Sequence, residues 1–484
     1  MLVRMLDCNH DHVLLFSLIS CVIFLISFIV YPVFSSQFDF EFSYNEGWNA
    51  YHQIGALDGA LYQNESRYVF TNYTPLSFFI VGYLSKSGDV ILVGRALSTI
   101  SFVGVVFLVA LICRKLHASR REALFGAVMC IGLLGAYHRI YVGIDDPQLL
   151  GSAVSLLGLL VYLGRRAGFI KNITTLSILI VAGLIKQTLL TIPIMIALDL
   201  AIRDRRQGVR FLVEAIVMVT AVILGLYLSF GYACFEQIFS PRQYSIHAAA
   251  TKTLSQPLLT SAVVPLAISF LAIYVRYEAN RLILIYVVSA LVVGALLSGG
   301  AGAESNQFID LAIASSIAGA AILRCLRKDL HADHRLTSAA VLVAFYGPAL
   351  QIPYAVEQLR DGLSGSLQAA ETSFHRDLQF MASYPGVAFC ECPMLCFRSG
   401  REFLIDPFNA SQAVRLGRLD PSPLLDKVAR GEFAVIQLST LEGHSFGPPL
   451  NGGAPDVEHE FRRLINERYR MVRTSGRRVF YLPK

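Results

Sequence analysis

Charged residues are scarce in this chain of 484 residues, because Asp, Glu, Lys and Arg make up only 16% of it. A soluble globular domain carries about 25% charged residues, so the composition excludes a chain that is water-soluble throughout. Hydrophobic residues account for 54%. Apolar stretches of about 18 or more residues, enough to cross a hydrocarbon core of about 30 Å, recur along most of the chain. We therefore expect an all-α polytopic membrane protein.

Nucleotide and nucleic-acid signals are also missing. The sequence has neither a P-loop nor a glycine-rich dinucleotide motif, so nothing in it indicates a nucleotide-bound substrate. The net charge of +6 does not indicate nucleic acid, because the basic residues cluster at the ends of apolar stretches, where the positive-inside rule places them. No internal repeat is visible. Membrane lipids, and no nucleic acid, are the expected surroundings.

The hydropathy pattern predicts about eleven transmembrane helices. Lys186 to Thr188 interrupt the apolar run 173–202, and the basic clusters Arg165/Arg166 and Arg203–Arg206 must share one side, so we split that run in two. One set of loops then holds 18 Lys and Arg and the other holds six, which predicts a cytoplasmic N-terminus and an outer C-terminus in a plasma membrane. The predicted spans are 13–34, 90–113, 122–138, 149–164, 173–185, 188–202, 211–232, 258–275, 282–298, 308–324 and 336–353.

Two domains follow from the change in composition near residue 358. We expect residues 1–357 to form the membrane domain, with a long outer loop at about 35–89. Within this loop, the short apolar segment 75–84 predicts an interfacial helix. Residues 358–484 are richer in charge and proline, and we expect a small extracytoplasmic α/β or α+β domain. Within it, 424–430 and 458–469 have helical periodicity, and 433–438 and 478–482 alternate like strands.

Three cysteines lie close together in the outer domain, at Cys390, Cys392 and Cys396. An oxidising outer compartment permits a disulfide between two of them. Zinc binding is the alternative, although the spacing is not that of a standard CxxC pair and no histidine is near.

The first outer loop contains the segment Tyr44-Asn45-Glu46-Gly47-Trp48-Asn49-Ala50-Tyr51-His52, with the only tryptophan of the chain. Trp48 and its tyrosine neighbours suit the headgroup level of a membrane. They would partly desolvate Glu46, which makes this carboxylate the first candidate for a general base.

Further polar residues gather on the same outer side. Asp145 and Asp146 are further catalytic candidates, although they precede Pro147 and a helix start, so helix capping is the alternative. Lys186 stands alone between two apolar stretches and is costly there unless it meets an anion such as a lipid phosphate. The other expected substrate-binding residues are His138, Arg139, Trp48, Tyr73, Arg242 and Asn306.

These residues resemble those of the GT-C glycosyltransferases of the bacterial protein-mannosyltransferase and aminoarabinose-transferase type. The resemblance covers about 13–355 and 380–484, and rests on order and sidedness. The matching segments are Tyr44–Asn49, Tyr73-Thr74-Pro75-Leu76, Asp145/Asp146, Lys186-Gln187-Thr188, Asp406-Pro407-Phe408 and Ser422–Leu425.

The resemblance implies a GT-C fold and inverting transfer of a sugar from a polyprenyl-phosphate donor to an extracytoplasmic acceptor. In the family the first-loop acid is often an Asp-Glu pair with the aspartate as the base, whereas this chain has Asn45-Glu46. Glu46 is then the expected base, with Asp145 or Asp146 next. No cofactor is required; a divalent metal held by Asp145, Asp146 and Glu46 is the alternative to charge neutralisation by Lys186.

Two other functional classes stay open. A transporter or flippase of lipid-linked sugars would share the many spans, but inverted repeats are not seen. A surface-polysaccharide polymerase or ligase would be expected to have its longest outer loop between late helices, whereas here the long loop is the first.

Overall fold

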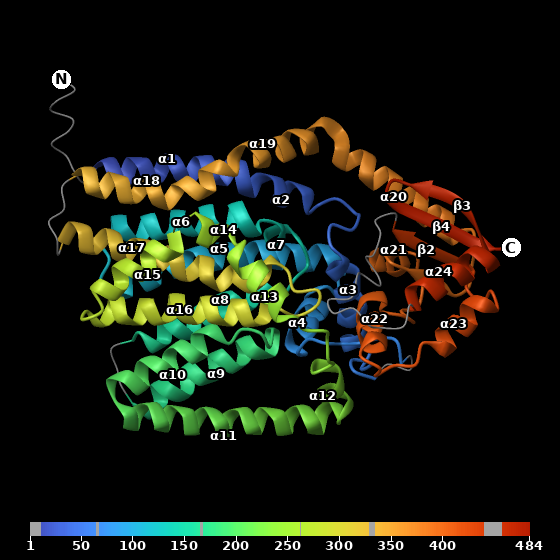
Figure 1. Cartoon of the computed structure of the whole chain (residues 1–484), viewed down its shortest axis with the longest axis horizontal. Coiled ribbons are helices and arrows are strands. Elements are labelled where there is room, and N and C mark those ends of the chain that lie inside the picture. Colours follow the sequence, from blue (N-terminus) through green and yellow to red (C-terminus); the bar gives the residue numbers. More distant parts are fainter. Residues whose placement is uncertain (1–10, 64–66, 165–167, 262, 329–333, 440–456) are drawn as a thin grey trace.

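The computed structural model describes residues 11–63, 67–164, 168–261, 263–328, 334–439 and 457–484. The predicted cytoplasmic residues Arg165 and Arg166 lie outside these ranges. Helices dominate, and the chain runs from a helical bundle at one end to a small mixed domain at the other, with the two termini at opposite ends (Figure 1).

Every predicted span corresponds to one helix or to two or three consecutive helical elements. Among the described residues, six helical segments are long and apolar enough to cross a membrane. The helices at the predicted spans are α1 (Asp11–Phe24) with η2 (Leu25–Ile29) and α2 (Val30–Ser35), α5 (Val90–Lys115), α6 (Arg120–His138), α8 (Gln148–Tyr162), α9 (Phe169–Ile185), α10 (Thr191–Arg203), α11 (Arg205–Phe230), α14 (Pro257–Thr260) with α15 (Val263–Ile273), α16 (Glu278–Ser298), α17 (Ile309–Lys328) and α18 (His334–Leu350).

Two helices show how the bundle divides between core and lipid. In the segment that contains α17, 89% of the most apolar stretch of 18 residues is buried inside the protein. This helix is rich in small residues, Ala, Ser and Gly, which allow close helix packing. Its neighbour α6 has Gly126 where a Cβ would lie 3.1 Å from the Cβ of Ala320. In α11 only 6% of the most apolar stretch of 18 residues is buried, and this helix runs along the edge of the bundle (Figure 1). Its exposed apolar side chains therefore face lipid.

The predicted outer loops contain short helices at the end of the bundle that faces the C-terminal domain. They are α3 (Tyr44–Leu57), α4 (Leu76–Leu84), α7 (Ile140–Gly143), α12 (Ala233–Ile238), α13 (Ile246–Leu254) and η3 (Ser305–Phe308). Ser43 begins α3 by accepting the Asn45 N–H. The predicted interfacial helix is α4, and it packs on α3 at Gly82, where a Cβ would meet the Gln53 carbonyl at 2.6 Å.

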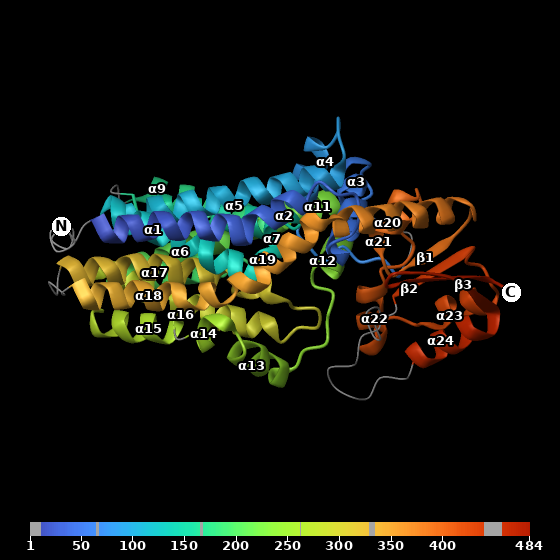
Figure 2. The same cartoon turned by 90° about the horizontal axis from the view of Figure 1, so that it is seen from above.

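A nearly continuous helical path joins the two domains. After α18 the chain forms α19 (Ile352–Asp361), η4 (Gly362–Ser366) and α20 (Leu367–Ala382), so the predicted boundary at 357/358 lies within α19. Gly365, with φ at 98°, allows the bend between α19 and α20. In both views α20 leads from the bundle into the C-terminal domain (Figures 1 and 2).

The C-terminal domain has a four-stranded sheet with the order β1-β2-β4-β3. Strands β1 (Ala388–Cys390) and β2 (Val435–Ser439) are parallel, whereas β2 with β4 (Arg478–Pro483) and β4 with β3 (Tyr469–Ser475) are antiparallel. The remaining helices are α21 (Pro393–Arg398), α22 (Pro407–Arg415), α23 (Ser422–Ala429) and α24 (Val457–Arg468). The helices and strands predicted for this region correspond to α23, α24, β2 and β4.

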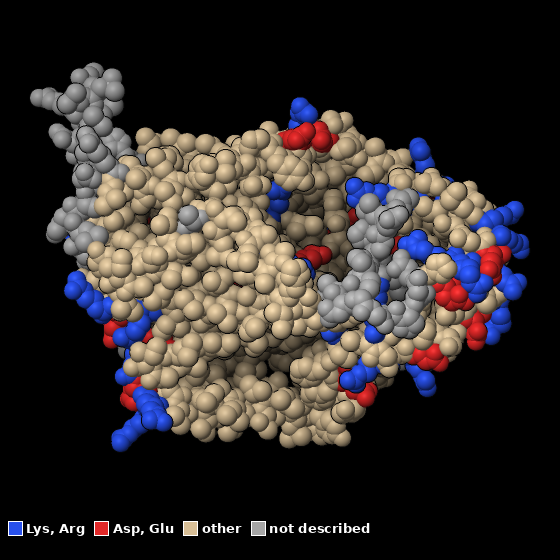
Figure 3. Space-filling model, in the orientation of Figure 1, with Lys and Arg blue, Asp and Glu red and all other residues tan. Residues whose placement is uncertain are grey.

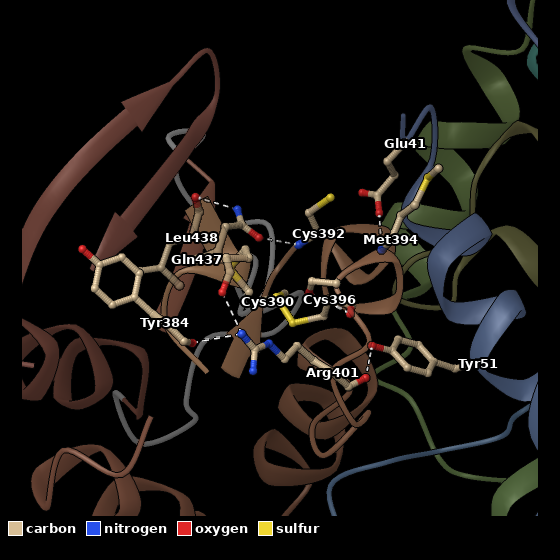
Figure 4. The surroundings of a disulfide bond; sticks show 12 residues. Glu41, Tyr51, Tyr384, Cys390, Cys392, Met394, Cys396, Arg401, Gln437 and Leu438 are labelled. Carbon is tan, nitrogen blue, oxygen red and sulfur yellow. Dashed lines mark hydrogen bonds between the residues drawn. A yellow bond between two sulfur atoms is a disulfide. The ribbon is translucent and has the colours of Figure 1, made fainter. Parts of the chain in front are cut away.

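A disulfide joins Cys390 at the end of β1 to Cys396 in α21 (Figure 4). Cys392 keeps a buried thiol. With two of the three thiols oxidised to each other, the three-cysteine zinc site considered from the sequence does not form in this structure.

Charge is distributed unevenly over the surface. On the face seen in Figure 3, most Lys, Arg, Asp and Glu gather at the two ends of the molecule, and a wide belt with few charged residues separates them. This is the distribution expected of a polytopic membrane protein whose ends lie in water.

Candidate active site

A cavity of about 600 Å³ lies between the bundle and the C-terminal domain. Figure 3 shows a hollow between these two parts of the molecule. Its walls come from the predicted outer loops and, in the C-terminal domain, from α22, the link between β1 and α21, and the end of β2. The polar and aromatic residues that line it include Glu41, Tyr44, Asn45, Trp48, Asn72, Tyr73, Tyr141, Lys186, Gln187, Arg242, Glu304, Asn306, Glu391, Phe408 and Asn409.

The structure brings half of the expected site residues to this cavity. Trp48, Tyr73, Lys186, Arg242 and Asn306 line it. The other five expected residues, Glu46, Asp145, Asp146, His138 and Arg139, are not among its lining residues.

Lys186 lies where the chain breaks between α9 and α10. It has an extended backbone, with φ at −153°, and its side chain is buried. Its Nζ is 3.1 Å from Asp146 Oδ1 and 5.1 Å from the centre of the Tyr73 ring. A buried ammonium at a cavity wall with one carboxylate partner can receive a second anion, because ammonium groups donate three hydrogen bonds.

Asp146 supports this lysine from behind. One oxygen of Asp146 accepts the Gln148 backbone N–H at 2.8 Å, which is the helix-capping contact that the sequence offered as an alternative to catalysis. Its other oxygen lies 3.5 Å from Asn45 Nδ2. Asp145 points elsewhere and accepts from Gln53 Nε2 at 2.8 Å. Neither aspartate is among the residues that line the cavity.

Glu46 is fully buried and belongs to a structural ion pair. Arg95 of α5 donates to both of its oxygens, through Nε at 2.6 Å and Nη2 at 2.9 Å. The Phe42 and Asp145 backbone N–H groups donate to the same carboxylate. This geometry corrects the expectation of a general base, because the carboxylate neither faces the cavity nor has an oxygen left for an acceptor. The sequence signal that was missed is an arginine inside an apolar span, which is costly unless it is paired.

The neighbouring residue Asn45 faces the cavity instead. An amide does not take up a proton at neutral pH, so Asn45 itself cannot act as a general base.

Trp48 is not exposed at a headgroup surface, contrary to expectation. Its ring packs against His52, Tyr73 and Phe78, and its Nε1 donates to Asp406 Oδ2 at 2.9 Å. Tyr44 donates to the other oxygen of Asp406 at 2.7 Å. Two side chains of α3 thus bind the carboxylate that begins α22 and attach the C-terminal domain to the bundle.

His138 and Arg139 lie away from the cavity. Arg139 donates to Gln358 Oε1 through Nε and Nη2 and stacks on Tyr354, so it binds α19. His138 is buried, and neither ring nitrogen has a hydrogen-bond partner within the described part of the chain. These two residues correct the expectation of phosphate binding, because the α6 helix turns them toward the interior and α19.

Arg242 is positioned by the C-terminal domain. Its Nη2 donates to Asn409 Oδ1 at 3.0 Å, and its guanidinium lies 5.2 Å from the centre of the Phe408 ring. The aspartate-proline-phenylalanine segment noted in the sequence thus reaches the cavity wall through Phe408.

Within the described part of the chain three glutamates line the cavity, and none of them was among the site residues expected from the sequence. Glu304 is exposed and accepts from the Tyr141 hydroxyl at 2.8 Å. Glu391 accepts the Ser439 N–H at 2.5 Å. Glu41 accepts the Met394 N–H at 3.0 Å beside Cys392 (Figure 4). All three fall in predicted outer segments, but a carboxylate in an outer loop is usually solvated, and the sequence does not distinguish these three from the rest.

Burial raises the pKa of Glu41 to about 8, although the Met394 N–H partly opposes this shift. A carboxyl group that titrates near neutral pH is matched to general base catalysis. Glu41 lies only four residues before Asn45, and both residues line the cavity.

Comparison with solved structures identifies the fold. ArnT from Cupriavidus metallidurans in the apo state superimposes with a TM-score of 0.57 at 14% identity, over 95% of this chain and 97% of that one. ArnT bound to undecaprenyl phosphate gives 0.55 at 14%, over 97% and 98%. The Archaeoglobus fulgidus oligosaccharyltransferase complex with Zn and sulfate gives 0.50 at 13%, over 88% and 68%. No family model and no curated protein sequence matches the chain. The chain therefore has the GT-C fold expected from its sequence.

Proposed function

We propose that this protein is a membrane glycosyltransferase that transfers a sugar from a polyprenyl-phosphate donor to an acceptor outside the cytoplasm. The observation that carries the proposal is the buried Lys186 at the wall of a cavity that opens between the membrane bundle and the outer domain. Support comes from the same fold in ArnT, which was solved with undecaprenyl phosphate bound. In this proposal the protein lies in the plasma membrane with its N-terminus in the cytoplasm.

The leaving group of this reaction is a lipid phosphate. Lys186 and Arg242 both line the cavity, and the Lys186 ammonium lies 5.1 Å from the centre of the Tyr73 ring in the same wall. Two cations fixed on one phosphate would stabilise the charge that develops as the sugar–phosphate bond breaks. Asp146 keeps Lys186 in place without filling the cavity.

The base in this proposal is Glu41. Glu41 takes the proton from the acceptor hydroxyl, the acceptor oxygen forms a bond to the anomeric carbon, and the bond from that carbon to the phosphate oxygen breaks. The electron pair leaves with the polyprenyl phosphate. Attack from the face opposite the phosphate inverts the anomeric centre. Asn45 and Glu304 are placed to hydrogen-bond the sugar or the acceptor between these groups.

A divalent metal does not fit the residues first considered for it. Glu46 is bound by Arg95, Asp145 by Gln53 and Asp146 by Lys186. Within the described ranges no group of three His, Cys, Asp or Glu side chains could hold a metal ion. We therefore assign charge neutralisation to the two cations.

The test uses purified protein in lipid discs with a panel of radiolabelled polyprenyl-phosphate sugars. We expect release of polyprenyl phosphate from one donor, and a loss of about 100-fold or more in Lys186→Ala, the scale on which removing a charge-stabilising donor acts. The matched control is Lys86→Ala, an exposed lysine at the same end of the bundle that does not line the cavity. Turnover of no donor, together with transbilayer movement of a lipid-linked sugar, would favour the transporter alternative.

A further inference from the structure

A second cavity, of about 820 Å³, lies at the end of the bundle opposite the C-terminal domain. It is enclosed by the ends of α5, α8, α10 and α17 and by the first turns of α9, α11 and α16. These helix ends lie on the side of the N-terminus (Figure 1). The proposed transfer reaction takes place at the other end of the bundle and gives this cavity no role.

The lining of this second cavity is strongly basic. Among the described residues, five Lys and Arg side chains line it, and Glu278 is the one Asp or Glu that does so. Two of the cations have carboxylate partners just outside the lining: Arg203 pairs with the fully buried Asp199 at 2.9 Å, and Arg210 pairs with Glu214 at 2.9 Å. The cavity therefore keeps a surplus of positive charge. The five cationic residues are Lys115, Lys171, Arg203, Arg210 and Arg324.

The positive-inside rule alone does not account for this arrangement. That rule places cations at helix ends, where they extend into water, whereas these five come from five different helices and share one hollow. Arg324 is buried, and its guanidinium donates to the Leu116 carbonyl and to Asn280 Oδ1. In the described part of the chain, no carboxylate lies within ion-pair distance of Lys115, Lys171 or Arg324. These three cations can therefore bind an anion from outside the chain.

The surroundings of the cavity indicate what kind of anion. Phe169 and Ile170 at the start of α9 are 54% and 80% exposed, and Val209 and Leu212 near the start of α11 are 55% and 54% exposed. Apolar side chains next to a basic hollow at a helix end are suited to a molecule with a charged head and acyl chains. Basic pockets between transmembrane helices bind phosphate-bearing head groups in this way.

We propose that this cavity binds the phosphate group of an anionic membrane lipid from the leaflet on the side of the N-terminus. Lys115 and Lys171 supply charge without carboxylate partners, and Arg324 forms the buried floor. Its volume is within the range of small-molecule sites and leaves room for a head group larger than phosphate itself. A soluble phosphate would use the same cations, so the test must separate the two sources.

The experiment measures lipid retention by native mass spectrometry of the full-length protein, extracted from discs that contain equal amounts of phosphatidylglycerol and phosphatidylcholine. We expect wild type to retain phosphatidylglycerol. The double variant Lys115→Gln/Lys171→Gln should lose at least five-fold in occupancy, while Lys115→Arg/Lys171→Arg should keep it. The matched control is Arg205→Gln/Arg206→Gln, which removes the same charge at the same end from residues that do not line the cavity.

Competition with inorganic phosphate distinguishes the ligands. Retention of phosphatidylglycerol that millimolar phosphate does not displace supports the lipid, whereas phosphate binding without lipid retention overturns the lipid assignment. An equal loss in the cavity variant and in the control, or no loss in either, overturns the site, because binding would then follow total charge. A cavity variant that no longer folds is recognised by gel filtration, and the arginine variant then tests the site.

Discussion

Arg95 uses all of its donor atoms to hold Glu46 and the start of the first outer loop. Nε and Nη2 bind the two carboxylate oxygens, while Nη1 and Nη2 also reach the carbonyls of Ser36, Phe38 and Phe40 at 2.6 to 3.1 Å. One buried arginine thereby fixes the segment that carries Glu41 and leads into α3.

The first prediction concerns this ion pair. Glu46→Gln should destabilise the protein by about 3–5 kcal/mol, because removing one partner leaves a buried charge without compensation. Thermal unfolding in detergent measures the change, with the exposed pair of Arg360 and Asp361 as the control: Asp361→Asn should cost no more than about 1 kcal/mol. A Glu46→Gln protein with wild-type stability and no turnover would instead return Glu46 to the role of the base.

The second prediction concerns the contact between the domains. A Cβ on Gly47 would lie 2.0 Å from the Met394 backbone nitrogen, so Gly47→Ala must separate α3 from α21. We expect faster proteolysis of the C-terminal domain and loss of turnover. Gly55→Ala is the matched control on the same helix, because its added Cβ meets nothing within 4 Å and alanine favours a helix. Equal proteolysis of the two variants would contradict the contact.

The third prediction concerns the base. With a pKa of about 8, Glu41 is active only when it is deprotonated, so kcat/KM should rise with pH and level off above about pH 8. Glu41→Gln should lose about 10²- to 10⁴-fold, the usual contribution of a general base. Adding Asn45→Asp to this variant restores a carboxylate on the same wall and should recover part of the rate. A Glu41→Gln enzyme with the unchanged pH profile would exclude Glu41, and Glu304→Gln would be tested next.

The fourth prediction links the same group to stability. The pKa of Glu41 is raised from 4.5 to about 8 in the folded protein, so the folded state binds its proton more tightly than the unfolded state. Its stabilising contribution is therefore complete below about pH 4.5 and is lost as pH rises to about 8. The melting temperature of Glu41→Gln should change less with pH over this window than that of wild type. Glu402→Gln, an exposed control, should follow wild type.

Much of the membrane architecture was predictable because it depends on local properties. A helix that crosses lipid must satisfy its backbone within itself and be apolar over a fixed length, so most of the eleven ranges could be recognised from their own residues. The same applies to α4, β2 and β4. Dividing 173–202 into two ranges also required the basic clusters on either side of it. The sequence did not specify that Cys390 pairs with Cys396, since three neighbouring thiols allow three different disulfides.

The choice of Glu41 over Glu46 as the proposed base depended on tertiary structure. Asn45 and Glu46 are adjacent, but consecutive helical residues point about 100° apart, so one faces the cavity and the other faces Arg95. Only the packing of α3 against α5 decides which one. Likewise Glu41 differs from other loop carboxylates only because α21, about 350 residues later, covers it.

The sequence by itself thus determined the helical membrane domain, the C-terminal domain and the loops in which polar residues gather, because hydropathy and charge act on each segment separately. The tertiary structure alone decided which of those polar residues share a cavity and which neutralise one another. Burial and pairing depend on contacts between segments that are distant in the chain, and the same carboxylate serves as a base or as a structural counter-charge according to the neighbour that folding gives it.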